Sequence, residues 1–177
     1  MTTIAELSAT VAALSARLEA LEDERAIREL VSRYSYHADC RRDEEWVDLW
    51  TEDGVYDLLS TVHYPDGSTR DLDRDWRGTQ GLRELITDPE GHHRAGFYGH
   101  SMHTGGSSMV VHVDGERAIA NSYSFLYQEH DGTVELVSAA DNQWTLHKVH
   151  GRWLIKERRR RQVGTPAFVE NLDATPT

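Results

Sequence analysis

The feature that most constrains the fold lies in the second half of the chain, where four long strand-like segments follow one another almost without a gap. They cover residues 100–113, 117–130, 134–149 and 152–163. The three gaps hold Asp114-Gly115, Asp131-Gly132 and His150-Gly151. Asp-Gly is a strong signal for a short hairpin, so these segments are predicted to pair as consecutive antiparallel strands. Strands of this length usually bend, and Gly105-Gly106 is the expected place for a bulge or kink.

The first forty residues have a helical pattern in two phases. Five apolar residues alternate in steps of four and three, which is a heptad seam: Leu7, Val11, Leu14, Leu18 and Leu21. The apolar phase then resets, and a second helix is predicted over residues 22–40. The seam packs either against its own domain or against another subunit. We expect a homo-oligomer, a dimer or trimer aided by this helix, because the stripe would otherwise form an exposed apolar patch.

The segments between these two regions are shorter. Asp43 is expected to cap a short helix that Gly54 ends, and the first strand follows over residues 55–59. Residues 64–74 are rich in Asp, Gly, Ser and Pro and are predicted to form an exposed loop or hairpin. The remaining predictions are a short strand over 75–77, a helix over 80–86, a polar stretch over 87–94 and an extended tail after residue 164.

Helices followed by long antiparallel strands indicate an α+β domain. We expect a cone-shaped barrel, in which a strongly curved mixed or antiparallel sheet wraps around the N-terminal helices. A cone of this kind offers a single deep, mostly apolar pocket at its open end. The predicted organisation is an N-terminal helix with a possible role in oligomerisation over 1–21, the barrel domain over 22–163, and the tail over 164–177.

Composition limits the class of partner and the compartment. The chain has 177 residues, 38% of them hydrophobic and 28% charged, which is typical of one globular domain. Its formal net charge of −11 argues against a nucleic-acid partner. No apolar run approaches the roughly 20 residues that cross a bilayer, and no secretory signal is visible. Cys40 is the single cysteine. These observations predict a cytoplasmic protein without a membrane partner.

An ordered series of motifs resembles the SnoaL-like branch of the nuclear-transport-factor-like superfamily, over residues 22–163. The motifs are Ile27-Arg28-Glu29-Leu30 leading to Tyr34 and Asp39; Thr51-Glu52-Asp53-Gly54-Val55-Tyr56 preceded by Trp46 and Trp50; Arg77-Gly78 before Leu82; His100-Ser101-Met102-His103; and Gly151-Arg152-Trp153-Leu154-Ile155. The superfamily includes dehydratases, dehydrochlorinases, isomerases, epoxide hydrolases, polyketide cyclases and non-catalytic members, so the fold alone does not decide the activity.

The resemblance implies four catalytic residues. In dehydratase-like relatives, an aspartate at the position of Asp39 partners a histidine, here His103. A neutral imidazole is a good general base near neutral pH, and a carboxylate would fix its tautomer. Tyr34 matches a tyrosine that binds a leaving oxygen or a carbonyl, and Arg158 matches a basic residue that stabilises a leaving anion. Arg160 is the next candidate within the basic run 158–161. The plainer alternatives are a core histidine, a packing tyrosine and a solvated basic edge.

A further set is predicted to bind substrate through polar groups and aromatic walls: Tyr36, Trp50, Tyr56, His100, Asn121, Tyr123, Phe125, Tyr127, Asn142 and Trp144. Four of them alternate along one predicted strand between residues 121 and 127, and Asn142 and Trp144 are expected to alternate in the same way on the next. His100 is also the competitor of His103, although three positions along an ideal strand place it on the opposite face.

The sequence contains no motif for a metal or a cofactor. The densest histidine group is His92, His93, His100 and His103, with no cysteine pair and no H-x-x-x-H pattern. Phosphate loops and dinucleotide fingerprints are missing as well. We therefore expect a metal-free and cofactor-independent lyase or isomerase, dehydratase-like, acting on a small apolar ring-containing molecule such as a steroid, polyketide or terpenoid. The alternatives are a polyketide cyclase, a non-catalytic binding domain, and the small subunit of a ring-hydroxylating oxygenase.

Overall fold

The computed structural model describes residues 3–63 and 69–173. The helices are α1 (Ile4–Asp39), α2 (Asp43–Val47), α3 (Gly78–Ile86) and α4 (Pro166–Asp173). The strands are β1 (Trp50–His63), β2 (Thr69–Arg77), β3 (Ser101–Asp114), β4 (Arg117–His130), β5 (Thr133–Val149) and β6 (Arg152–Gln162). The four long strands expected in the second half are present, with ends within one or two residues of those predicted.

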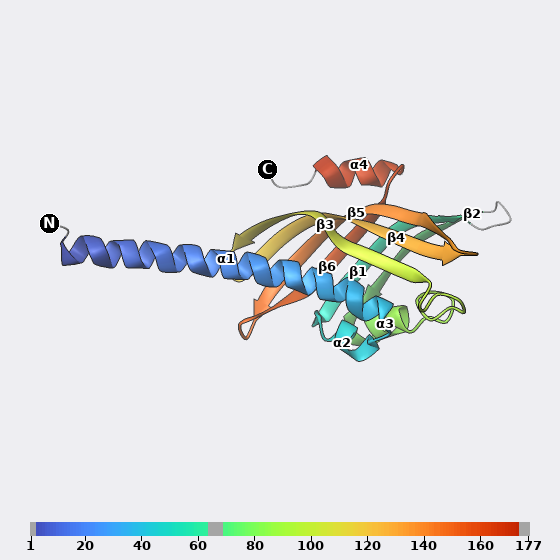
Figure 1. The fold of residues 1–177 in the computed structure, drawn as a ribbon, viewed down its shortest axis with the longest axis horizontal. Helices are drawn as coiled ribbons and strands as arrows, with labels where there is room; N and C mark the ends of the chain where they lie inside the picture. Colours follow the sequence, from blue (N-terminus) through green and yellow to red (C-terminus); the bar gives the residue numbers. More distant parts are fainter. Residues whose placement is uncertain (1–2, 64–68, 174–177) are drawn as a thin grey trace.

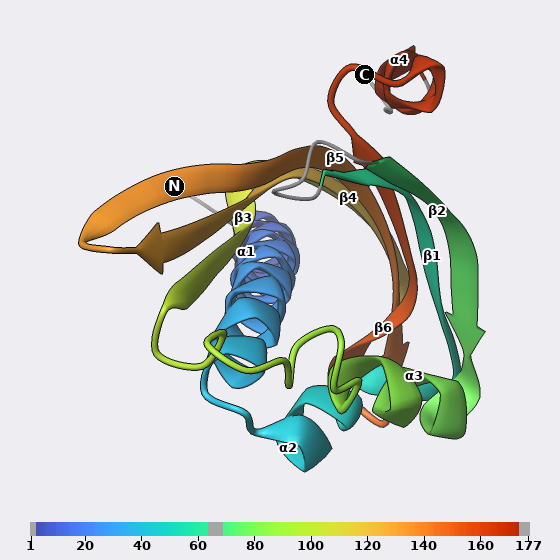
Figure 2. The ribbon, with the colours of Figure 1, turned by 90° about the vertical axis from the view of Figure 1, so that its right-hand side faces the viewer.

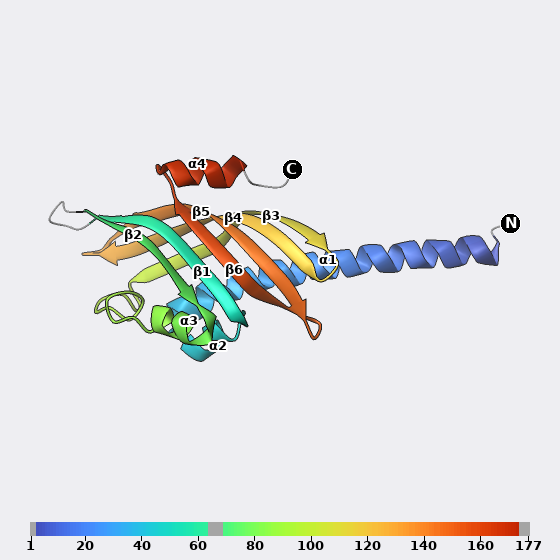
Figure 3. The same cartoon turned by 180° about the vertical axis from the view of Figure 1, so that it is seen from behind.

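One six-stranded sheet carries the fold, with the strand order β2-β1-β6-β5-β4-β3. β1 and β6 are parallel, and every other neighbouring pair is antiparallel. The sheet curves into an arch around α1, while α2 and α3 lie below its edge and α4 lies on the outer face (Figure 2). Seen from behind, the strands run obliquely across the domain (Figure 3). The predicted fold, a curved sheet around N-terminal helices, is confirmed.

Helix α1 is a single helix of 36 residues, begun by a capping box between Thr3 and Glu6. The predicted division near residue 22 is wrong, because a change of apolar face requires no break in the backbone. Only the C-terminal half of α1 is buried by the domain, and the N-terminal half projects beyond the sheet (Figure 1). Asp23 marks the junction, where it accepts hydrogen bonds from Lys148 (2.7 Å) and Trp153 (2.8 Å).

The core lies between the C-terminal half of α1 and the concave face of the sheet. Four apolar residues of α1 enter it as one stripe: Ile27, Leu30, Val31 and Tyr34. Aromatic rings from α2 and two strands, β1 and β5, cluster around Tyr34, and they are those of Trp46, Trp50, Tyr56 and Trp144. Helix α3 closes the lower edge with buried leucine and isoleucine side chains. Tyr34 and Tyr56 of this aromatic cluster also line a cavity on the concave side of the sheet.

Two predictions around the first strand are wrong. Helix α2 begins at Asp43, but Arg42 is its N-cap and makes no side-chain capping bond. Gly54 does not end a helix, because α2 stops at Val47 and Gly54 lies inside β1, where the register shifts. A Cβ at Gly54 would lie 3.0 Å from the Thr51 carbonyl oxygen. Glycine therefore permits a tight bend in the strand.

The predicted loop over residues 64–74 is partly wrong. Residues 64–68 lie outside the described residues, but β2 begins at Thr69 and pairs with β1 from Thr69 opposite His63 to Arg77 opposite Val55. This strand is an edge strand, and backbone pairing holds it although its sequence is polar.

The C-terminal prediction is also wrong in part, because residues 166–173 form α4 instead of an extended tail. Proline suits the first turn of a helix, and the Thr165 hydroxyl accepts the backbone N–H of Phe168 (3.3 Å). The Asn171 amide donates to Asp141 on the outer face of β5. A polar contact with the sheet thus anchors the helix. Residues 174–177 lie outside the described residues.

The predicted bulge at Gly105-Gly106 is confirmed by a register shift between Thr104 and Ser107. A Cβ at Gly105 would lie 2.7 Å from the Ser35 hydroxyl of α1. The helix and strand therefore approach more closely here than a side chain would allow. Among the described residues, no helix is both long and apolar enough to cross a membrane.

Candidate active site

A cavity of about 250 Å³ opens between α1 and the concave face of the sheet. Its lining combines aromatic, hydroxyl and basic side chains with few aliphatic ones: Tyr34, Ser35, Tyr56, Leu58, Ser60, His92, Arg94, His103, Thr104, Gly105, Ser124, Phe125, Leu126, Val137, Ser138, Arg158 and Arg160. No carboxylate is in this lining.

A larger groove of about 530 Å³ lies on the opposite face of β1 and β2. Apart from Val55, every residue that lines it is charged, and ion pairs join several of them, including Arg77 with Asp75. It has no aromatic wall and no histidine. The smaller cavity is therefore the candidate site.

Asp39 and His103 meet at one end of this cavity. Asp39 is the last residue of α1, and His103 lies near the start of β3. One carboxylate oxygen of Asp39 accepts the backbone N–H of His103 at 2.9 Å, and the other lies 2.5 Å from the His103 Nδ1. An ionised Asp39 requires the ring proton on Nδ1, which leaves Nε2 as a proton acceptor. The aspartate at the unfavourable end of a helix is therefore explained by its bond to the histidine strand.

His92 stacks on His103, with ring centroids 5.4 Å apart and an interplanar angle of 24°. Phe97 packs edge-on against the His103 ring at 5.8 Å. The pKa of His92 is lowered to about 3, mainly by burial and also by electrostatic interactions with His103, Arg158 and Arg94. His92 is consequently neutral near pH 7 and can offer a hydrogen bond without a charge.

A polar network forms the floor of the cavity. The buried Arg158 donates to the Tyr34 hydroxyl at 2.5 Å and, through Nη2 and Nε, to the Asn142 side-chain oxygen at 2.7 and 3.0 Å. The Asn142 amide donates in turn to the Ser122 carbonyl (3.1 Å). The guanidinium also lies 4.7 Å from the Trp144 ring centroid. Because the Tyr34 oxygen accepts from Arg158, its own proton is available to a ligand.

That hydroxyl stays protonated, because burial raises the pKa of Tyr34 well above its usual value. Tyr34 is therefore a neutral donor in the same cavity as the imidazole base. This is the arrangement that a negatively charged oxygen in a transition state requires.

Arg160 lies two residues further along β6. Its Nη2 donates to the Ser138 hydroxyl (2.5 Å) and its Nη1 to the Ser60 hydroxyl (3.4 Å). Arg94 also lines the cavity, donating to the Gln128 side chain (2.9 Å). Burial lowers the pKa of both guanidinium groups, but they remain cationic at any physiological pH.

The predicted binding residues divide into three groups. Tyr56 and Phe125 line the cavity. Trp50, Trp144 and Asn142 are buried behind its wall, where they support Tyr34 and Arg158.

The third group does not line the cavity, and it consists of Tyr36, His100, Asn121, Tyr123 and Tyr127. Tyr36 is 71% exposed, because two helical positions place it about 200° from Tyr34. His100 is exposed and pairs with Glu129 at 2.6 Å. The middle of β4 turns Ser122 and Ser124 inward, and Tyr123 between them is consequently exposed.

Sequence reasoning missed His92 and Arg94 as cavity residues, and also the serines at 60, 124 and 138. His92 and Arg94 lie in an irregular segment that showed no motif. The sequence signal for His92 was its place in a dense group of histidines, which suggests a metal site rather than a cavity wall. Arg94 had no signal of its own. Among residues 3–63 and 69–173, no group of three His, Cys, Asp or Glu side chains could hold a metal ion.

A curved sheet around one long helix, with an aspartate–histidine pair in the enclosed cavity, defines the class of cone-shaped α+β proteins. The chain matches the SnoaL-like domain model over residues 19–159 and belongs to that family. This confirms the resemblance seen in the motifs. No curated protein matches the chain.

Solved structures agree on the fold. An NTF2-like protein with a cystatin-like fold from Novosphingobium aromaticivorans is 26% identical, with 97% of this chain and 98% of that chain covered and a TM-score of 0.75. A candidate scytalone dehydratase from the same organism is 22% identical, with coverage of 81% and 85% and a TM-score of 0.58. The β subunit of a candidate aromatic-ring-hydroxylating dioxygenase, again from that organism, is 18% identical, with coverage of 81% and 90% and a TM-score of 0.63. These structures share the fold of this chain, and their names describe a dehydratase and a subunit of a larger assembly.

Proposed function

We propose that this protein is a cofactor-independent lyase of the dehydratase type, acting on a ring-containing β-hydroxy carbonyl compound. The observation that carries the proposal is the His103 ring, oriented by Asp39 so that Nε2 is the free nitrogen in a cavity lined by aromatic rings. An imidazole held in this way is a general base near neutral pH, and the neighbouring carboxylate stabilises the imidazolium that forms.

The reaction begins when His103 Nε2 removes a proton from the carbon next to the carbonyl. The electron pair moves onto the carbonyl oxygen, where the Tyr34 hydroxyl donates to it and Arg158 supports Tyr34 through its own hydrogen bond. The pair then returns to form the carbon–carbon double bond. The β-hydroxyl leaves with the proton held by His103 and departs as water. Both nitrogens of His103 thereby return to their starting states.

His92 supports this scheme as a neutral neighbour. A cationic ring beside His103 would oppose the imidazolium, whereas the low pKa of His92 keeps it uncharged. The first proton transfer is shared with isomerisation and with intramolecular aldol cyclisation. An isomerase or polyketide cyclase is therefore the second candidate, and a binding domain or oxygenase subunit is the third. A binding domain or oxygenase subunit would not need a histidine with a free ring nitrogen in the cavity, so the Asp39–His103 pair favours the two enzyme candidates.

The proton transfer can be tested without knowing the leaving group. A set of cyclic ketones that lack a β-hydroxyl is incubated in D₂O, and NMR follows exchange of the α-hydrogens. We expect the wild type to accelerate exchange for some of them and His103→Ala to lose about 10²–10⁴-fold of that acceleration.

His100→Ala is the matched control, since His100 lies on the same stretch of chain but pairs with Glu129 outside the cavity. It should exchange at the wild-type rate. Equal rates for His103→Ala and the wild type would contradict the proposal. A loss caused by unfolding is recognised from the circular dichroism spectrum and melting temperature.

A further inference from the structure

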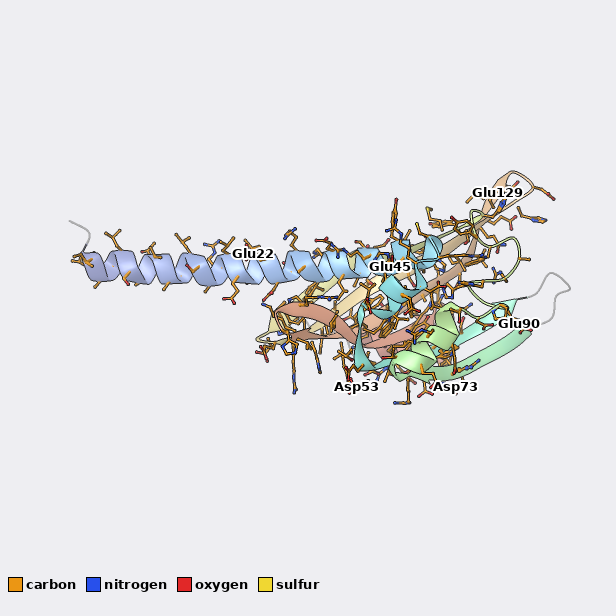
Figure 4. The ribbon with its side chains drawn as sticks, turned by 90° about the horizontal axis from the view of Figure 1, so that it is seen from below. Glu22, Glu45, Asp53, Asp73, Glu90 and Glu129 are labelled. Carbon is orange, nitrogen blue, oxygen red and sulfur yellow. The ribbon has the colours of Figure 1, made fainter. Side chains whose placement is uncertain are left out.

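The cavity is unusual in its charge. Three arginines line it, Arg94, Arg158 and Arg160, and its lining holds no carboxylate. Asp39 contacts the lining residue His103 and is already bonded to it. The protein as a whole has a net charge of −11, and the acidic side chains labelled in Figure 4 lie along the helix and around the outside of the domain. The positive charge in the cavity is thus opposite in sign to that of its surroundings.

The three guanidinium groups are not equivalent. Arg158 is committed to Tyr34 and Asn142 through three of its nitrogens. Arg94 donates to Gln128 and lies over the Phe97 ring, 4.2 Å from its centroid. Arg160 is half-buried, and both of its side-chain contacts are neutral serine hydroxyls. No ion pair of Arg160 is found among the described residues.

A charged group removed from water needs an opposite charge nearby, because otherwise nothing replaces its lost hydration. Outside the cavity, the same strand obeys this rule: Arg161 pairs with Asp57 at 2.7 Å, and Arg159 lies within ion-pair distance of Asp57 and Glu157. Arg160 differs from both neighbours because it faces the cavity. The Ser138 hydroxyl accepts from Arg160 and keeps its own proton for a further bond.

We propose that Arg160, together with Ser138, binds an anionic group of the ligand, a carboxylate in the first instance, and that the ligand of this cavity is a ring-containing acid. The inference rests on the proposed function only in taking this cavity as the substrate site. An arginine fork matches a carboxylate in two parallel hydrogen bonds, and the serine hydroxyl adds a third donor. The ligand's acid group lies on the side formed by β1, β5 and β6, and its reacting carbon lies beside β3.

The test measures binding rather than turnover. The probes are benzoate, 1-naphthoate and 2-naphthoate, each compared with its own amide by isothermal titration calorimetry at constant ionic strength. At least one acid should bind the wild type about tenfold or more tightly than its amide. Arg160→Gln should reduce that preference to less than about threefold while leaving the amide affinity unchanged.

Arg159→Gln is the matched control, because it removes the same charge from the adjacent position on the other face of β6. It should retain the full preference for the acid. An equal loss in both variants would show a general effect of net charge and would overturn the subsite. No preference in the wild type would overturn it as well.

His103→Ala separates this proposal from the catalytic one. That variant should keep the acid preference if the subsite is correct, whether or not it still promotes exchange. Conversely, His103-dependent exchange in a protein without acid preference would retain the proposed function and reject the anionic subsite. Melting temperatures of all three variants establish that the binding data come from folded protein.

A second and independent observation concerns the projecting half of α1. Ile4 extends the predicted seam, so that isoleucine, valine and leucine alternate with leucine in a–d spacing: Ile4, Leu7, Val11, Leu14, Leu18 and Leu21. Each of these side chains is more than half exposed. The other half of the helix buries Ile27 to Ala38 against the sheet. At 100° per residue, the seam and the buried stripe point to nearly opposite sides of the helix, about 160° apart.

The seam therefore faces away from its own domain, and folding back against that domain is excluded by the helix direction. In parallel coiled coils, β-branched residues at a positions with leucine at d positions favour two strands over three or four. Arg17 and Glu22 occupy a g and the following e position, which face each other between the two chains of a parallel in-register pair. Neither has an ion-pair partner in the described part of the chain.

We infer that the N-terminal half of α1 pairs with the same segment of a second copy, as a parallel two-stranded coiled coil that places two domains at one end. The full chain should sediment as a dimer at tens of micromolar. Leu14→Glu should convert it to a monomer, while Ala16→Glu, on the outer face of the helix, should not.

Disulfide trapping tests the direction in a Cys40→Ser background. Leu7→Cys should form a disulfide with its own copy under mild oxidation, because equal positions meet in a parallel pair. Ala16→Cys should not. In an antiparallel pair Leu7 would lie opposite Leu18, so a dimer in which Leu7→Cys fails to crosslink would overturn the parallel arrangement. A monomeric wild type, or a dimer that survives Leu14→Glu, would overturn the pairing itself.

Discussion

The two ends of the cavity hold their polar groups in opposite ways. At one end the His103 imidazole is matched by a carboxylate that bonds both its ring and its backbone. At the other end the Arg160 guanidinium is held only by neutral hydroxyls. The first end is complete without a ligand and is suited to move a proton. The second end lacks a negative charge and is suited to bind an anionic group of a ligand. The comparison therefore assigns proton transfer to the first end and ligand recognition to the second.

The largest effect on activity is expected from removing the carboxylate that is paired with His103. Asp39→Asn should lower the rate of α-hydrogen exchange by about 100-fold or more, because an amide cannot stabilise the imidazolium and permits the wrong tautomer. Exchange followed by NMR, as for His103→Ala, measures it.

Asp43→Asn provides the control, since Asp43 forms a similar pair with His93 at 3.0 Å away from the cavity lining. Its rate should equal that of the wild type. If Asp39→Asn remained within about threefold of the wild type, Asp39 would have only a structural role.

An intermediate effect, on ligand affinity, is expected from placing a carboxylate beside Arg160. Ser138→Asp places a carboxylate where the Ser138 hydroxyl contacts Arg160, and it should weaken binding of the preferred acid by about tenfold, because the guanidinium becomes paired within the protein. Ser138→Asn is the neutral control of similar size. Calorimetry with the same acid and amide pairs distinguishes the two variants. Tighter binding of the acid by Ser138→Asp would contradict the view that the ligand supplies the negative charge that Arg160 lacks.

The smallest effect concerns the pH dependence of stability through His92. Its folded pKa of about 3 lies below the value near 6.5 in an unfolded chain, so its stabilising contribution is present above pH 6.5 and is lost as the pH falls toward 3. The half-buried ring remains within reach of water in the cavity, so we expect a loss of about 1 kcal/mol between pH 7 and pH 5.

Urea unfolding at both pH values measures this loss. In His92→Gln the difference between the two pH values should shrink by that amount, whereas in His130→Gln, a change at an exposed histidine, it should not. An unchanged difference in His92→Gln would show that the ring is not desolvated in solution.

Local patterns in the sequence predicted much of this protein. Strand periodicity and the glycine turns located β3 to β6, because neighbouring strands joined by short hairpins need no information from distant parts of the chain. The motif order predicted the family, and through it the contact of Asp39 with His103. The bulge at Gly105-Gly106 was predicted from the glycine pair itself, whereas the close approach of the Ser35 hydroxyl, which requires glycine there, is a tertiary contact.

The tertiary structure alone decided which groups face the cavity. β2 is polar and is held by pairing with β1, and α4 is held on the sheet by the bond from Asn171 to Asp141, so contacts with distant strands stabilise both elements. The direction of the side chains in β4 depends on bulges and on the curvature of the sheet, which turn Ser124 inward and leave Tyr123 exposed. His92 reaches His103 from an irregular segment that folding places beside β3. The sequence determined the elements because hydrogen-bond periodicity is local, whereas the lining of the cavity arises from contacts between residues far apart in the chain.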